Sequence, residues 1–177
     1  MPAVNRKGYR MEYVYIGQWI GWKESPAHVK RTKIAAGICC TLSFLLYLCT
    51  AVISSPVNYG RLVSMTGLLA LAPFIFVVFG VFQFCLSKEK MTKDTFRDIS
   101  AKLKVAPVIY AFLTITCGIL CMIEVFRSGY GPEHLLIGAG YILSAAAQIV
   151  LFVRFSSLHK KIPEKQALGI SKEKYRI

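Results

Sequence analysis

The chain alternates between long apolar runs and short segments rich in charged and turn-forming residues. Four runs are apolar almost throughout, and they cover residues 34–53, 62–86, 105–126 and 135–153. A lipid hydrocarbon core of about 30 Å needs roughly 20 helical residues, so each run is long enough to cross it. Transmembrane strands would have about 9–11 residues with alternating polarity, which these runs lack. The pattern predicts an all-α integral membrane four-helix bundle, with the last span reaching about residue 155.

Basic residues divide the connecting segments into two classes. Residues 1–33, 87–104 and 159–177 hold seven, six and six Lys or Arg residues, whereas 54–61 and 127–134 hold one each. Positively charged segments are retained in the cytoplasm, so we expect both termini and the middle segment there. The chain then consists of an N-terminal segment, a transmembrane domain over residues 34–158 with a cytoplasmic linker, and a basic tail.

Composition agrees with this division. Hydrophobic residues make up 55% of the chain and charged residues 18%, against about 45–50% and 25% in soluble domains. The net charge of +13 lies beside the apolar runs, where it suits anionic lipid head groups better than nucleic acid. The first run follows 33 residues that include seven basic ones, so we interpret it as a retained anchor rather than a cleaved signal.

The two predicted hairpins share a weak internal similarity. Tyr59-Gly60 and Tyr130-Gly131 lie 71 residues apart, as do Gly67 and Gly138. These matches suggest a parallel repeat of two helical hairpins, with coincidence as the alternative.

Two helix starts can be placed from capping residues. Ser25 followed by Pro26 suits the N-terminus of a helix that enters the first span. Thr92 suits the start of a second, amphipathic helix in the linker 87–104, which we expect to lie on the inner leaflet. The apolar residues of that helix that share one face are Phe96, Ile99 and Leu103.

The stretch "YVYIGQWIGW", residues 13–22, is aromatic but too short to span a bilayer. Its rings prefer the head-group region, so we expect an interfacial anchor; a flexible arm and a docking segment for a cytoplasmic partner are alternatives. The anchor residues are Tyr13, Tyr15, Trp19 and Trp22.

Polar residues in or near the spans are candidates for function. Glu124 near the end of the third run is either an interfacial carboxylate paired with Arg127 or a proton- or cation-handling group. Together with Glu133 and His134 it could form a polar pathway or vestibule. Gln148 in the fourth run either hydrogen-bonds between helices or contacts a substrate.

Small residues predict close helix packing. Gly138, Gly140 and Ser144 share the fourth run and could serve the bundle or a homo-oligomer. Pro73 removes a backbone hydrogen bond near the centre of the second run and predicts a bend.

No catalytic, cofactor or metal site is predicted. All six cysteines lie in the apolar runs, away from the outer turns where disulfides would form, and we interpret them as packing residues. A Gly-rich phosphate loop, a His-Glu-x-x-His pair and a nucleophile elbow are absent from the sequence.

These observations favour a non-enzymatic polytopic membrane protein. We expect an accessory or scaffold subunit whose basic and aromatic cytoplasmic segments bind anionic lipid head groups or a membrane partner. The alternative is a small oligomeric transporter or channel with Glu124 and Gln148 in its pathway. The expected location is a bacterial cytoplasmic membrane.

Overall fold

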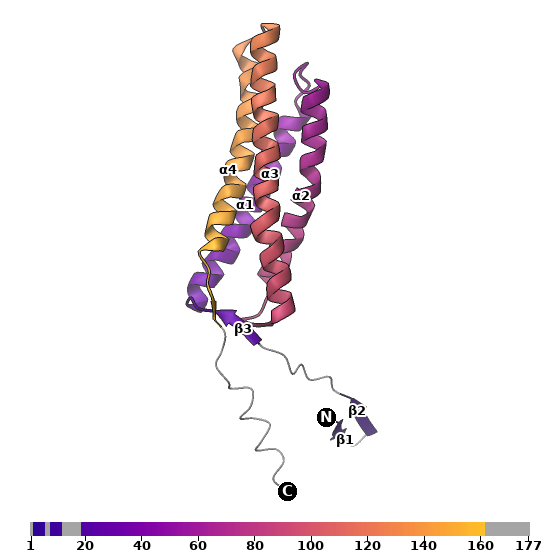
Figure 1. Cartoon of the computed structure of the whole chain (residues 1–177), viewed down its shortest axis with the longest axis vertical. Helices are drawn as coiled ribbons and strands as arrows, with labels where there is room; N and C mark the ends of the chain where they lie inside the picture. The colour runs from indigo at the N-terminus through magenta and orange to yellow at the C-terminus, as the bar shows by residue number, and fades with distance from the viewer. Residues whose placement is uncertain (1, 6–7, 12–18, 162–177) are drawn as a thin grey trace.

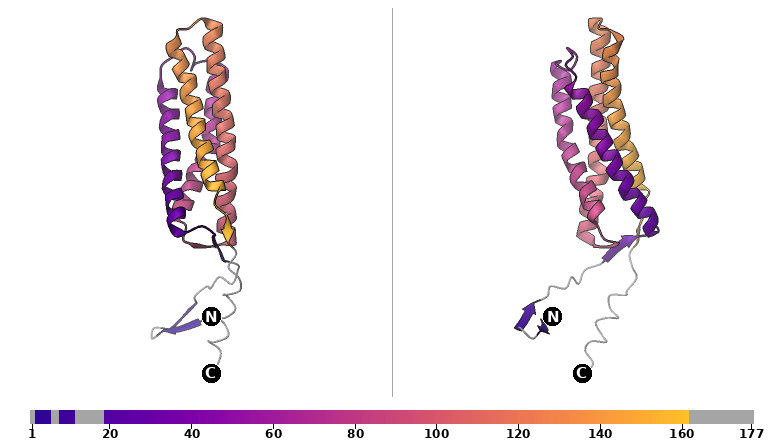
Figure 2. Two further views of the ribbon diagram at one scale, coloured as in Figure 1. Left: turned by 90° about the vertical axis from the view of Figure 1, so that its left-hand side faces the viewer. Right: turned by 180° about the vertical axis from the view of Figure 1, so that it is seen from behind.

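The computed structural model describes residues 2–5, 8–11 and 19–161. The prediction of four apolar helices packed as a bundle is confirmed, and the helices lie side by side along the long axis (Figures 1 and 2). They are α1 Pro26–Val52, α2 Arg61–Leu86, α3 Lys93–Ser128 and α4 Leu135–Ser156, with a short 3-10 turn, η1 Pro132–His134, before α4.

By length and composition, all four helices can cross a membrane. Only 28% to 39% of the most apolar window of each helix is buried inside the bundle. Apolar side chains therefore cover much of the outer surface, for example Leu68, Phe82 and Phe112. An outer surface of this kind belongs in lipid rather than in water, so the chain is a polytopic membrane protein.

The helix ends follow from local chemistry. The Ser25 hydroxyl accepts the His28 N–H at 3.3 Å, and Pro26 takes the first helical position of α1, as predicted. The Thr92 hydroxyl likewise accepts the Thr95 N–H at 3.3 Å at the start of α3. α3 ends at Gly129, whose φ of +67° is a left-handed conformation that glycine adopts without strain.

The linker does not contain a separate surface helix. Residues 93–104 form the first turns of α3, which continues without a break through Pro107. The apolar face of these turns explains the difference, because Ile99 and Leu103 are 1% and 0% exposed and pack into the bundle. Burying that face against the bundle keeps the segment in line with the span.

Glycines mark where helices approach most closely. A Cβ added at Gly138 would stand 2.9 Å from the Gly118 carbonyl oxygen, and one added at Gly118 would stand 2.8 Å from the Gly138 carbonyl oxygen. α3 and α4 therefore touch backbone to backbone at this pair, as small residues allow in membrane bundles. Gly140 similarly admits the Thr50 side chain of α1.

Three short strands close one end of the bundle, which we call the basic end. β3 Trp19–Trp22 pairs antiparallel with β4 Lys90–Thr92 on one side and with β5 Lys160–Lys161 on the other. β3 crosses beneath the helices there (Figure 1). The sheet thus joins the segment before α1, the segment before α3 and the segment after α4.

A separate hairpin pairs β1 Pro2–Asn5 with β2 Gly8–Met11. The orientation of the bundle across the membrane and the parallel repeat of its hairpins both stay predictions.

Candidate functional site

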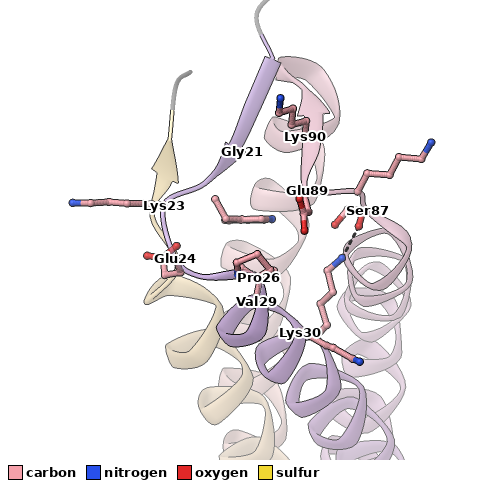
Figure 3. A pocket seen from close by; sticks show the side chains of 12 residues that line it. Gly21, Lys23, Glu24, Pro26, Val29, Lys30, Ser87, Glu89 and Lys90 are labelled. Carbon is pink, nitrogen blue, oxygen red and sulfur yellow. Dashed lines mark hydrogen bonds between the residues drawn. The ribbon is translucent and has the colours of Figure 1, made fainter. Parts of the chain in front are cut away.

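A pocket of about 860 Å³ opens at the basic end, between the start of α1 and the segment that joins α2 to β4. Its lining is rich in lysine, and Figure 3 shows the two segments that border it. The lysines that line it are Lys23, Lys30, Lys33, Lys88 and Lys90. Two carboxylates, Glu24 and Glu89, also line it, so the lining carries a net positive charge.

Lys33 holds the two sides of the pocket together. Its ammonium donates to the Ser87 carbonyl oxygen at 2.5 Å and to the Cys85 carbonyl oxygen at 3.4 Å (Figure 3). These carbonyls belong to the C-terminal end of α2, where helix carbonyls lack partners and a cation is favourable. Lys33 therefore fixes the distance between α1 and α2 at the pocket, and an ammonium with three donors retains one for a ligand.

An aromatic floor lies under the sheet. The Trp22 ring packs against three phenylalanine rings at centroid distances of 5.7, 5.2 and 6.1 Å, namely Phe84, Phe96 and Phe155. Its indole Nε1 is buried, and the described residues offer it no hydrogen-bond acceptor. Trp22 lines the pocket together with Val29 and Pro26, so apolar surface lies next to the lysines.

Glu24 forms hydrogen bonds with His159, the residue directly before β5, at this end of the bundle. Its carboxylate accepts the His159 backbone N–H at 2.9 Å and the His159 imidazole Nδ1 at 3.0 Å. Burial alone would raise the pKa of Glu24, but the two hydrogen bonds from His159 hold the pKa below its ordinary value of 4.5. One carboxylate oxygen of Glu24, Oε1, is therefore bonded to His159, whereas Oε2 is buried and has no partner among the described residues.

The start of α1 adds to the positive character of the pocket. Pro26 and Val29, in the first turn of this helix, line it. The N-terminus of a helix carries a partial positive charge, which favours an anion nearby.

A second polar group lies inside the bundle. The Ser144 hydroxyl is within 3.0 Å of the Ser43 hydroxyl and 2.8 Å of the Tyr110 hydroxyl, so α1, α3 and α4 share one hydrogen-bonded cluster. Gln148, one turn along α4, is 0% exposed, and within the described part of the chain neither its amide nitrogen nor its amide oxygen has a partner. Gln148 therefore makes no hydrogen bond between helices, although its sequence position suggested one.

The acidic and histidine candidates lie at the opposite end of the bundle. Glu124 accepts a hydrogen bond from the Ser128 hydroxyl at 3.2 Å, and among the described residues no ion pair joins it to Arg127. His134 Nδ1 lies 2.9 Å from the Ser55 hydroxyl and links the two outer turns. The Glu133 side chain lies outside the described part of the structure.

Glu124 and Gln148 are far apart. Glu124 lies 14 residues beyond Tyr110 on α3, whereas Gln148 lies one turn from Ser144 toward the basic end. At about 1.5 Å per residue the separation along the bundle is roughly 20 Å or more. The structure does not bring these two candidates into one site.

Two further sequence candidates, Pro73 and Trp19, lie within regular elements of the fold. Pro73 lies inside α2 without ending the helix. Trp19 is the exposed start of β3, whereas Tyr13 and Tyr15 lie outside the described residues.

The pocket is not evident from the sequence alone. Lys30 and Lys33 are separated from Lys88 and Lys90 by more than 50 residues, and each pair looks like an ordinary basic flank of a span. One feature of the sequence does point to it: the first two apolar runs are joined by a short turn. The basic segment before the first run and the basic segment after the second run must therefore lie at the same end of one hairpin. No known protein family, curated protein or solved structure matches this chain.

Proposed function

We propose that the protein is a non-enzymatic accessory or scaffold protein of the membrane whose basic end faces the cytoplasm and binds anionic lipid head groups. The observation that carries this proposal is the lysine-lined pocket at the end of an apolar bundle. Lysines held at the membrane surface attract anionic lipids, and each is worth about 1 kcal/mol there. The concentration of basic residues on the same three segments supports the orientation.

Trp22 gives this end a fixed shape. Its contacts with Phe84, Phe96 and Phe155 join α2, α3 and α4 directly under the sheet. A packed end of this kind holds the backbone positions of its lysines in place, which suits a scaffold.

The test compares thermal unfolding in nanodiscs of neutral phosphatidylcholine with unfolding in nanodiscs that contain phosphatidylglycerol. Anionic lipid is expected to raise the midpoint by several degrees at low salt, and the gain should shrink in high salt because exposed charges are screened. Equal midpoints in both lipids would overturn the proposal. Reporter tags at both termini check the orientation, and an outward location would contradict it.

A transport role is the second candidate, and the unpaired amide of Gln148 favours it. Buried polar groups within membrane bundles often serve substrates or ions. Ion and small-solute flux into liposomes, measured for the wild type and for Gln148→Met and Glu124→Gln, tests this role. Loss of an observed flux in both variants is the expected result, and an absence of wild-type flux would reject it.

A further inference from the structure

We propose that the pocket at the basic end binds the phosphate of a single phospholipid, with one acyl chain running along the seam between α1 and α2. This inference rests on the proposed function, because it assumes that the basic end meets anionic lipid. It adds a defined site, a stoichiometry and a lipid class to general attraction by charge.

The charges of the pocket fit a phosphate group. Lysines from two segments are among the residues that line the pocket, namely Lys30 on α1 and Lys88 and Lys90 after α2. Lysine binds phosphate as a compact point charge, without the planar geometry that arginine requires. The remaining donor of Lys33 and the positive end of α1 lie in the same place.

The carboxylate of Glu89 restricts which phospholipid head groups fit the pocket. Its carboxylate lines the pocket among the lysines and points inward in Figure 3. A carboxylate disfavours a doubly charged phosphate but can accept hydrogen bonds from hydroxyl groups. A singly charged phosphodiester whose head group bears hydroxyls, such as phosphatidylglycerol, satisfies both the lysines and Glu89.

The seam below the pocket has room for an acyl chain. Gly37 lies one turn deeper than Lys33 on the same side of α1, and a Cβ added there would meet no atom within 4 Å. Further along, the stacked rings of Phe44 and Phe74, 5.5 Å apart, close α1 against α2. The open space at Gly37 therefore lies between the Lys33–Ser87 contact and this ring pair, and the proposal places the acyl chain there. A lipid fits this arrangement better than a soluble phosphate ester, which would leave the seam unused.

The first test is native mass spectrometry of the whole protein, released from micelles after exchange into phosphatidylglycerol. One retained lipid per chain is expected for the wild type, and at least a fivefold lower bound fraction is expected for Lys30→Ala combined with Lys90→Ala. The control is Lys93→Ala combined with Lys104→Ala, which removes two exposed lysines of the same end that do not line the pocket. Equal losses in both double variants would overturn the site while leaving general lipid attraction intact.

The second test separates a lipid from a soluble phosphate ester. Binding of glycerophosphoglycerol, the phosphodiester head group without acyl chains, and of dihexanoyl-phosphatidylglycerol is measured on the protein in detergent by calorimetry. The lipid is expected to bind at least about tenfold more tightly, because burying even two methylene groups provides that factor. Gly37→Leu, which fills the space beside α1, should remove this advantage without changing the affinity for glycerophosphoglycerol.

Each outcome of these tests is decisive for the inference. If Gly37→Leu leaves lipid affinity unchanged, the chain does not occupy the seam and the inference fails. If anionic nanodiscs stabilise the wild type but no lipid is retained, the proposed function stands without the pocket. If anionic nanodiscs have no effect and no lipid is retained, both fail. Glu89→Ala is expected to lower the preference for phosphatidylglycerol over phosphatidic acid, and an unchanged preference would overturn the assigned head-group class.

Discussion

The ammonium of Lys33 lies 2.5 Å from the carbonyl oxygen of Ser87, so a side chain at the start of α1 satisfies the backbone at the end of α2. This contact joins the two ends of the first hairpin, which are 54 residues apart in the chain. We therefore expect the ammonium of Lys33 to contribute measurably to the free energy of unfolding of the bundle.

Lys33→Met is expected to lower the free energy of unfolding by about 1–2 kcal/mol, because a charged donor to two carbonyl oxygens is lost. The measurement is reversible unfolding in detergent micelles. Lys30→Met is the matched control, since Lys30 lies one turn away and has no recorded bond to α2 within the described structure. Equal losses in the two variants would show that the Lys33 contact contributes nothing specific.

The contact between Glu24 and His159 predicts a dependence on pH. The pKa of Glu24 is lower in the folded chain than its ordinary value of 4.5, so the contact stabilises fully above that pH and is lost as pH falls through the folded value. The probe is hydrogen exchange at the Lys23 amide, which donates to the His159 carbonyl oxygen at 2.9 Å. Protection, corrected for intrinsic exchange, should fall in acid below about pH 4.5.

Glu24→Gln should weaken this protection already at neutral pH and remove its acid dependence. Glu89→Gln, which has no such contact recorded with His159, should keep the wild-type profile. An acid transition that persists in Glu24→Gln would assign it to another group.

The backbone contact between Gly118 and Gly138 predicts strong sensitivity to one methyl group. Gly118→Ala and Gly138→Ala should each destabilise the bundle by about 1–3 kcal/mol, because the added Cβ would stand less than 3.0 Å from the opposite carbonyl oxygen. Gly37→Ala is the control, and there open space and better helix propensity should leave stability unchanged or raise it by up to about 1 kcal/mol. A neutral result at both packed glycines would contradict the close approach.

The buried amide of Gln148 predicts a stabilising substitution. Gln148→Met keeps the side-chain volume and removes two polar atoms that lack partners, so unfolding should cost about 1 kcal/mol more than in the wild type. Ser144→Ala, which removes the hydroxyl bonded within the cluster of Ser43 and Tyr110, should destabilise by about 1–2 kcal/mol. Destabilisation by Gln148→Met would mean that the amide has a partner in the membrane.

The helices could be predicted because each rests on a local signal. A run of apolar residues long enough to span the bilayer, a serine before a proline and a threonine at the start of α3 all act within a few positions of the chain. The sequence does not decide whether residues 93–104 lie along the membrane surface or continue into the span, since an apolar face suits a membrane surface as well as a neighbouring helix. Only packing against the bundle, at Ile99 and Leu103, decided it.

The sheet and the pocket could not be predicted from local pattern. β3, β4 and β5 have two to four residues each, and their partners lie about 70 to 140 positions away. Such short strands form where helix ends have already brought the backbone together. The pocket lysines follow from the same geometry, because they converge only once α1 and α2 stand side by side.

The strand order β4-β3-β5 also sets a sequence of events during biosynthesis. β5 follows the last helix, so it leaves the ribosome after all four spans have entered the translocation machinery. β3 and β4 can pair as soon as the first hairpin is inserted, but the third strand must wait until α4 has been made. The side of β3 that faces away from β4 is therefore left open until β5 pairs with it, so a chain that stops before β5 leaves the central strand half paired.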